Sequence, residues 1–144
     1  MSEQTISTTN RKSTAEPRTT AEYKAAIAEM LKEIDEAFER MIAMAEAFEF
    51  GVDQAIDRHA LPWHVTRLGG RAEYLFQPEP ARNGGEALAS ADYELDRFMH
   101  LYALNRGILM TPFHNMALMS PSTSMADVDK HTRVFGEAVG ELFP

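Results

Sequence analysis

From about Thr20 to His59, apolar residues recur at every third or fourth position, which is the spacing of one buried face on an α-helix. The pattern persists for about eight helical turns. Asp35 and Glu36 could restart the helix, because acidic residues favour a first turn. We therefore expect one long helix or two abutting ones. The residues of this stripe are Ile27, Met30, Leu31, Ile34, Phe38, Met41, Ile42, Ala45, Phe48, Val52 and Ile56.

A helix of about 40 residues would be about 60 Å long, more than a domain of this size can cover. The sequence thus predicts that part of the stripe is core and that part packs against another chain. Two-fold pairing is the commonest closed arrangement, so a dimer through residues 20–59 is expected. On this hypothesis Phe48→Asp would dissociate the dimer.

After Leu61-Pro62 the pattern changes, since the residue before a proline avoids helical geometry. Two strand-like runs, residues 63–68 and 71–76, flank Gly69-Gly70 and predict a β-hairpin. Prolines and glycines in residues 78–85 then predict a loop.

A second helix is predicted for residues 90–106, with Ser90 as its N-cap and Gly107 just past its end. Short apolar strands are predicted at residues 108–111 and 116–120. A last helix is expected after Ser124, because Ser124 and Asp127 have capping-box spacing. Helices segregated from strand pairs indicate an α+β fold, with a small, mainly antiparallel sheet covered by helices and a long N-terminal amphipathic helix.

Residues 111–115 form a polar corner between two apolar runs. Pro112 fixes φ and lacks an amide donor, which suits a corner better than a central strand. We expect His114 and Asn115 to be ordered, open to solvent and directed away from the sheet core. His114 could simply cap backbone carbonyls, or both residues could line a substrate channel; they are the substrate-side candidates.

The formal net charge is −8, from 14 Lys+Arg against 22 Asp+Glu, which disfavours nucleic acid and anionic membranes as partners. Cysteine is absent, which excludes disulfides and thiolate chemistry. No apolar run is long enough to span a bilayer. Residues 1–19 are polar and lack the apolar centre of a signal peptide, so a disordered tail and a cytoplasmic location are expected.

Known catalytic and metal-binding patterns are missing from the sequence. No serine lies in a Gly-x-Ser-x-Gly elbow, and neither glycine pair opens a helix as a phosphate loop does. No two histidines have metal-ligand spacing on a helix, so no metal site is predicted. Catalytic and cofactor-binding residues are likewise not assigned. The histidines are His59, His64, His100, His114 and His131.

Three stretches in order carry a family resemblance: RMIAMAEAFEFGVDQAIDRHALPWHVTRLGGRAEYLF, ELDRFMHLYALNRGILMTPFHNMALMS and SMADVDKHTRVFGEAVGEL. From about Phe38 to Phe143, the chain resembles the C-terminal part of a class III (fold-type I) pyridoxal-phosphate-dependent aminotransferase, closest to the glutamate-1-semialdehyde aminomutase-like group. The resemblance implies that residues 20–144 form the small domain of such an enzyme. It also implies that the corner returns toward the substrate side of the cofactor.

The family's chemistry needs a lysine that links to pyridoxal phosphate (PLP), and this lysine would lie upstream of the matched region. The chain's lysines are Lys12, Lys24, Lys32 and Lys130, and none is expected to play that part. Alone, the chain is expected to be inactive and to bind no cofactor.

Two hypotheses follow. The first is a truncated or split-gene fragment that either completes a separate PLP-domain chain or has lost the activity. The second is a non-catalytic, self-associating interaction module. The substrate is not assigned by the sequence.

Overall fold

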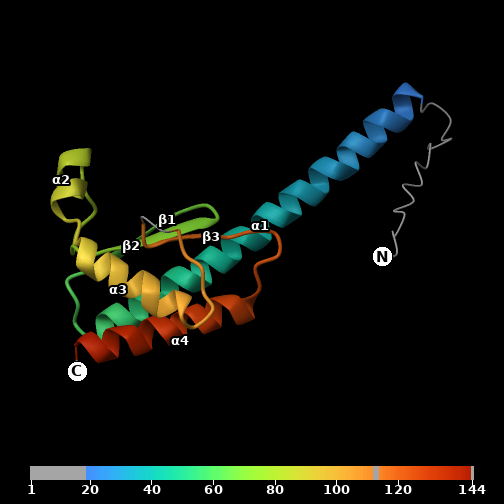
Figure 1. Ribbon diagram of the computed structural model, residues 1–144. Coiled ribbons are helices and arrows are strands. Elements are labelled where there is room, and N and C mark those ends of the chain that lie inside the picture. The colour runs from blue at the N-terminus through green and yellow to red at the C-terminus, as the bar shows by residue number, and fades with distance from the viewer. Residues whose placement is uncertain (1–18, 112–113, 144) are drawn as a thin grey trace, which may run out of the picture. The chain divides into compact units, whose positions relative to one another are not determined.

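The computed structural model describes residues 19–111 and 114–143 (Figure 1). The predicted tail, apart from Thr19, and the corner residues Pro112 and Phe113 lie outside them. The predicted α+β class is confirmed. The elements are α1 (Thr20–Arg58), β1 (His64–Leu68), β2 (Arg71–Leu75), α2 (Gly84–Ala89), α3 (Tyr93–Leu104), β3 (Met116–Leu118) and α4 (Met125–Leu142).

The chain divides into two compact units, residues 1–33 and 34–144, and α1 is one continuous helix that passes through both. The alternative of two abutting helices is therefore wrong. Thr19 and Glu22 cap the helix start reciprocally: the Glu22 carboxylate accepts from the Thr19 amide at 2.6 Å, and the Glu22 amide donates to Thr19 Oγ1 at 3.3 Å.

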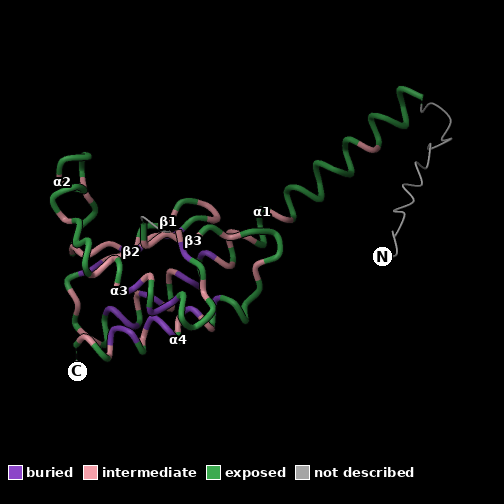
Figure 2. Tube along the Cα trace, in the orientation of Figure 1, coloured by how far each residue is buried: buried purple, intermediate pink, exposed green. Residues whose placement is uncertain are grey.

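Only the second half of the apolar stripe on α1 belongs to the core (Figure 2). Phe48, which the sequence suggested for a dimer seam, is 2% exposed inside its own chain, so that assignment is wrong. Its ring packs against His131 of α4 with centroids 4.4 Å apart. The buried residues of α1 are Ala45, Phe48, Val52, Ala55 and Ile56.

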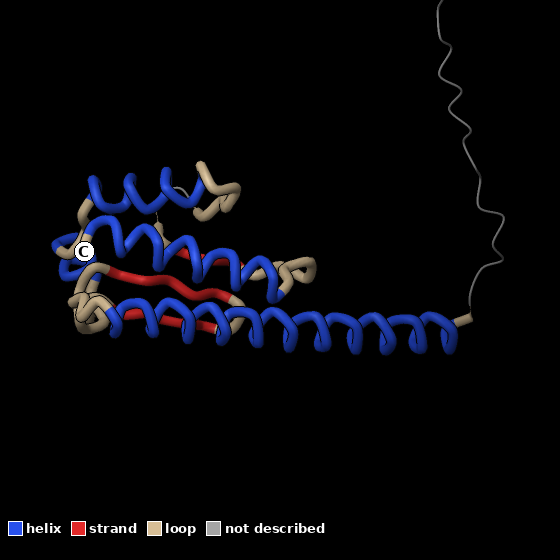
Figure 3. The backbone as a smooth tube through the Cα atoms, turned by 90° about the horizontal axis from the view of Figure 1, so that it is seen from below, coloured by secondary structure: helices blue, strands red, loops and turns tan. Residues whose placement is uncertain are grey.

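The sheet is antiparallel with the order β1-β2-β3. The predicted hairpin is confirmed, and Gly69 takes the positive φ of 57° that its turn requires. Strand alternation turns Ala72 and Tyr74 of β2 into the core. Within the second unit, α1, α3 and α4 lie on that same side of the sheet (Figures 1 and 3).

The opposite side of the sheet, here called the open face, carries Leu68, Arg71, Glu73, Met116 and Leu118. In the register, Leu68 pairs with Arg71, Arg71 with Leu118, and Glu73 with Met116, so all five point the same way. Leu68 is 78% exposed and Leu118 is 62% exposed. The prediction of a sheet covered by helices thus holds for one of its two faces.

The helix predicted for residues 90–106 is found as α3, which starts three residues later than predicted, and a short additional helix, α2, precedes it. Ser90 ends α2 instead of starting a helix, and its amide donates to the Glu86 carbonyl at 3.2 Å. Asp92 is the N-cap of α3, because its carboxylate accepts from the amides of Glu94 and Leu95 at 3.1 and 3.0 Å. Asn83 caps α2 in the same way, inside what was predicted as loop.

The strand predicted at residues 108–111 does not form, whereas β3 does. Gly107, with a φ of 74°, turns the chain at the end of α3, and the Ile108 amide donates to the Ala103 carbonyl at 3.0 Å. That bond ties the segment to the helix. Further along, the Thr111 amide reaches the Met116 carbonyl at 3.5 Å.

α4 begins as the sequence predicts. The Asp127 carboxylate accepts from the amide and the hydroxyl of Ser124 at 2.9 and 2.7 Å, and these bonds hold the pKa of Asp127 below its ordinary value. In α4, His131 joins the apolar residues of the buried face.

Gly51 allows α1 and α4 to approach closely. A Cβ added at Gly51 would lie 2.8 Å from Cγ2 of Thr132. We expect Gly51→Ala to lower the free energy of unfolding by about 1–2 kcal/mol, because overpacking outweighs the better helix propensity of alanine. Denaturant titration should show the loss, and adding Thr132→Ala should recover most of it. A stable Gly51→Ala single variant would contradict this packing.

Candidate functional site

A groove of about 470 Å³ lies beside the open face, between β2, the α2–α3 connection and the corner. Strand alternation directs Arg71 and Glu73 from β2 toward it. The residues with polar groups that line it are Arg71, Glu73, Tyr74, Ser90, Tyr93, Asp96, His114 and Asn115.

Backbone bonds fix the corner to β2. The Tyr74 amide donates to the Asn115 carbonyl at 3.2 Å, one step beyond the β2–β3 ladder. The His114 amide donates to the Thr111 carbonyl at 3.3 Å, which closes the turn. Both predicted substrate-side residues are therefore held at the groove by the sheet.

On the open-face side of the groove, Glu73 contacts two basic side chains, Arg71 and His114. Its carboxylate lies 2.7 Å from Nη2 of Arg71 and 3.4 Å from Nδ1 of His114. The Glu73 side chain is 16% exposed, whereas that of His114 is 60% exposed. The His114 side chain thus contacts a carboxylate.

Asn115 holds a second carboxylate, since its Nδ2 donates to Oδ1 of Asp96 at 2.7 Å. Burial raises the pKa of Asp96 above its ordinary value, the Asn115 bond opposes this shift, and the charge of Asp92 adds to it. The pKa of Tyr74 is also raised, first by burial and then by the charge of Asp96. Asp96 is therefore easier to protonate than a surface aspartate.

Substituting the two corner residues, His114 and Asn115, should affect the stability of the fold to different extents. Asn115→Ala should lower the free energy of unfolding by about 1–2 kcal/mol, because Asp96 would lose a hydrogen bond in a partly buried place. His114→Ala should cost less than about 0.5 kcal/mol, because its contact is solvent-exposed. Thermal unfolding at neutral pH measures both. Equal losses would mean that the Asp96 contact does not form in solution.

The other histidines do not reach the groove. His59 Nδ1 lies 3.3 Å from the Phe143 carbonyl, and His64 Nδ1 lies 2.6 Å from the Gln77 carbonyl. His100 lines a small cavity with Asp96 and Asn115. Across residues 19–111 and 114–143, no three His, Asp or Glu side chains are placed to share a metal ion.

Sequence reasoning missed Glu73 and Asp96 as partners of the corner. Asp96 falls in a first helical turn, where a carboxylate is usually solvated. Glu73 alternates with two buried residues, Ala72 and Tyr74, and this alternation does place it on the sheet's other face. Its position could have been predicted, but its contact with His114 depends on the corner's tertiary path.

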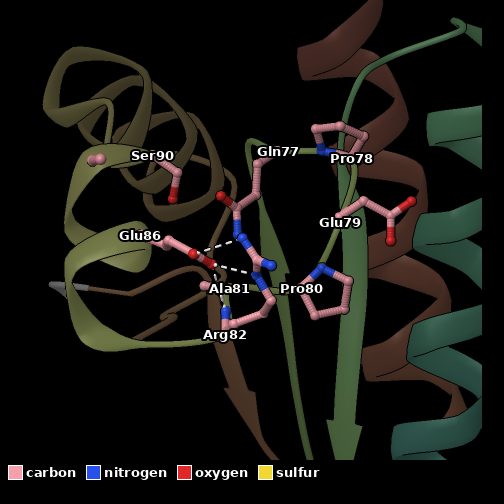
Figure 4. A pocket seen from close by; sticks show the side chains of 9 residues that line it. Gln77, Pro78, Glu79, Pro80, Ala81, Arg82, Glu86 and Ser90 are labelled. Atoms are coloured by element: carbon pink, nitrogen blue, oxygen red, sulfur yellow. Dashed lines mark hydrogen bonds and ion pairs between the residues drawn. The ribbon is translucent and has the colours of Figure 1, made fainter.

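A second hollow, of about 730 Å³, lies between α2 and the loop after β2 (Figure 4). Arg82 and Glu86 face each other there, with Nη2 3.0 Å from Oε1. The Arg82 amide also donates to the Glu86 carboxylate at 2.8 Å, and these bonds lower the pKa of Glu86. Arg82 and Glu86 neutralise each other's charge, so neither is left to bind a ligand in this hollow. The groove beside the open face is therefore the stronger candidate site.

No family model and no curated protein sequence matches the chain. Among solved structures, a glutamate-1-semialdehyde-aminomutase from Pseudomonas aeruginosa PAO1 is 47% identical, with a TM-score of 0.73 over 74% of this chain. The chain belongs to the class III aminotransferase family, in its aminomutase-like group. A variant of the same enzyme was solved in complex with PMP at the same identity.

Two more distant structures share the aminotransferase fold. They are an omega-transaminase from Sphaerobacter thermophilus, 18% identical with a TM-score of 0.62 over 73% of this chain, and a β-phenylalanine aminotransferase from Variovorax paradoxus, 22% identical with a TM-score of 0.61 over 71%. This aminomutase-like chain spans 24%, 24% and 23% of the P. aeruginosa, S. thermophilus and V. paradoxus structures.

Within residues 19–111 and 114–143 of this aminotransferase-family chain, no lysine is placed to hold PLP. A cofactor-linking lysine must point into a pocket, yet Lys130 lies on the surface and donates to the Gly107 carbonyl at 3.1 Å. Lys24 and Lys32 lie on exposed turns of α1, and Lys12 is outside the described residues. None of the three described lysines lines the groove.

Proposed function

We propose that residues 20–144 act as the small domain of a PLP-dependent aminotransferase or aminomutase and complete an active site whose cofactor is bound by another polypeptide segment. The observation that carries this proposal is the 47% identity over 74% of the chain to an aminomutase of which the chain spans 24%. A split-gene arrangement, with the cofactor domain on a separate chain, is the form we favour. Its location would be the cytoplasm.

The open face and the groove are the surface that would meet the cofactor segment. Leu68 and Leu118 expose much of their apolar area next to the charged pair of Arg71 and Glu73. Exposed apolar area rimmed by polar groups is typical of an interaction site. The helices α1, α3 and α4 of the second unit lie on the other side of the sheet (Figure 1).

In this arrangement PLP supplies the electron-sink chemistry when its own segment binds it. His114 and Asn115 would line the substrate side, where His114 can donate to a polar substrate group. Asn115 would hold Asp96 in place beneath it. The contribution of this chain is therefore to orient the substrate and exclude water, and the proposal requires no catalytic residue from it.

The purified chain should not link to PLP. At stoichiometric PLP and neutral pH, we expect its visible spectrum to match that of a variant with all four lysines replaced by arginine. The reason is that no described lysine points into a pocket that could hold the cofactor. A discrete lysine-linked band that the four-lysine variant lacks would contradict this expectation.

A chimeric enzyme tests the role of the groove. Residues 38–143 would replace the matching quarter of the P. aeruginosa aminomutase. We expect this chimera to be active, and we expect His114→Ala and Asn115→Ala each to lower kcat/KM by about tenfold or more. His59→Ala, outside the groove, is the matched control. If these two variants keep their activity and lose only stability, the corner has a structural role and does not contact the substrate.

A non-catalytic, self-associating module is the second candidate function. The observation that favours it is the exposed apolar stripe on the first half of α1, which the small-domain proposal does not use. The two candidates use different surfaces, so the same chain could have both properties.

A further inference from the structure

The first half of α1 is coloured as exposed along most of its length (Figure 2). Six of its large apolar side chains are about half exposed within the described chain. An unsupported helix of about 20 residues is marginal in water, so a helix of this kind normally packs against a partner. The residues and exposed fractions are Tyr23 54%, Ile27 50%, Met30 53%, Leu31 55%, Ile34 43% and Phe38 55%.

The spacing of these residues is self-complementary in the antiparallel direction. Leu31 follows Met30, Ile27 and Ile34 lie equally far on either side of that pair, and Tyr23 and Phe38 lie equally far beyond them. A second copy running the opposite way would therefore place Tyr23 opposite Phe38, Ile27 opposite Ile34 and Met30 opposite Leu31. The stripe also follows the three-and-four spacing of paired helices.

The charges beside the stripe fit the same register. At 100° per residue, Lys24 and Asp35 fall on the same flank of the stripe. A two-fold axis perpendicular to the helix brings like flanks of two copies together. Lys24 of each copy then lies within two positions, or about 3 Å along the helix axis, of Asp35 on the other copy, and this pair occurs twice. Parallel pairing would not bring Lys24 near Asp35.

We propose that this chain forms a homodimer by antiparallel pairing of α1 over residues 20–40, with the two-fold axis between Met30 and Leu31. The six side chains are about half exposed, and burying the rest would hide about 100 Å² each, on the order of 1,200 Å² for two copies. That area is at the lower limit of stable interfaces. The surface is separate from the groove, so the proposal stands whether or not the chain serves an aminotransferase.

Single cysteines test the register directly, because the natural chain has none. With a mild oxidant at tens of micromolar, Met30→Cys should give a covalent dimer, since both sulfurs would lie next to the two-fold axis. Tyr23→Cys is the matched control and should stay monomeric under denaturing conditions, because the two Tyr23 positions lie at opposite ends of the seam. Cross-linking through Tyr23→Cys but not Met30→Cys would overturn the antiparallel register.

Charge exchange gives an independent measurement by sedimentation equilibrium. Lys24→Glu and Asp35→Lys should each raise the dimer dissociation constant by about fivefold or more, and the double variant should restore it. Glu29→Lys, on the opposite side of the helix, should change it by less than twofold. A wild-type monomer at 50–100 µM, taken as roughly the concentration range such an interface needs, or a dimer that none of the stripe variants alters, would overturn the proposal.

Discussion

Phe48→Asp is expected to unfold the protein. The side chain is 2% exposed and contacts the His131 ring, so the substitution removes a buried aromatic ring and places a carboxylate in an apolar core. Loss of the Phe48 ring alone should lower the free energy of unfolding by about 3–5 kcal/mol. Burial of the unpaired aspartate side chain adds to this loss. Because a domain of this size is stable by only about 5–15 kcal/mol, far-UV circular dichroism should show lost helix and a non-cooperative melt.

Phe38→Asp is the matched control on the same helix. Phe38 is 55% exposed, so its replacement should change the stability of the fold by less than about 1 kcal/mol. If dimerisation through α1 contributes to the melting temperature, dilution should reveal that part. A folded Phe48→Asp protein that merely becomes monomeric would restore the sequence-based view that Phe48 belongs to a dimer seam.

His131 should make the fold sensitive to acid. Its ring centroid lies 4.4 Å from that of Phe48 and 6.0 Å from that of Phe135, and burial lowers the pKa of His131 from 6.5 to about 4. The unfolded chain therefore binds this proton more readily than the folded chain. Burial of the neutral His131 ring therefore contributes its full stabilisation above about pH 6.5, and this stabilisation is lost as the pH falls toward 4. The size of this pKa shift corresponds to a loss of about 3 kcal/mol in the free energy of unfolding.

The measurement compares wild type with His131→Phe by urea unfolding between pH 7 and 4. Carboxylates common to both proteins cancel in the difference, so the variant should lose about 3 kcal/mol less than wild type over this range. His114→Ala, at a 60% exposed position, should follow the wild-type curve. Identical pH profiles for wild type and His131→Phe would show that His131 is not buried as described.

The sequence predicts elements well where the signal is local. The hairpin around Gly69, the start of α4 at Ser124 and the end of α3 before Gly107 all depend on residues within a few positions of each other. The start of the predicted 90–106 helix is misplaced because Ser90 and Asp92 are both good caps, and spacing alone does not show that Ser90 ends one helix and Asp92 begins the next.

The candidate site was only half predictable. His114 and Asn115 stand out because polar side chains interrupt apolar runs, but their partners come from β2 and α3, far away in sequence. Likewise, the periodicity of α1 is uniform from Ile27 to Ile56, although one half is core and the other is exposed. Periodicity identifies the apolar face of a helix and does not say what covers it.

The proposed function is tested most directly by co-expressing this chain with the cofactor-bearing remainder of the P. aeruginosa aminomutase. The account predicts that the two polypeptides purify together, retain PLP and convert glutamate-1-semialdehyde, whereas neither does so alone. Docking through the open face further predicts that Leu68→Glu with Leu118→Glu, a pair of exposed substitutions, abolishes co-purification while this chain stays folded. A soluble, PLP-loaded remainder that leaves this chain free in the same lysate would contradict the central claim.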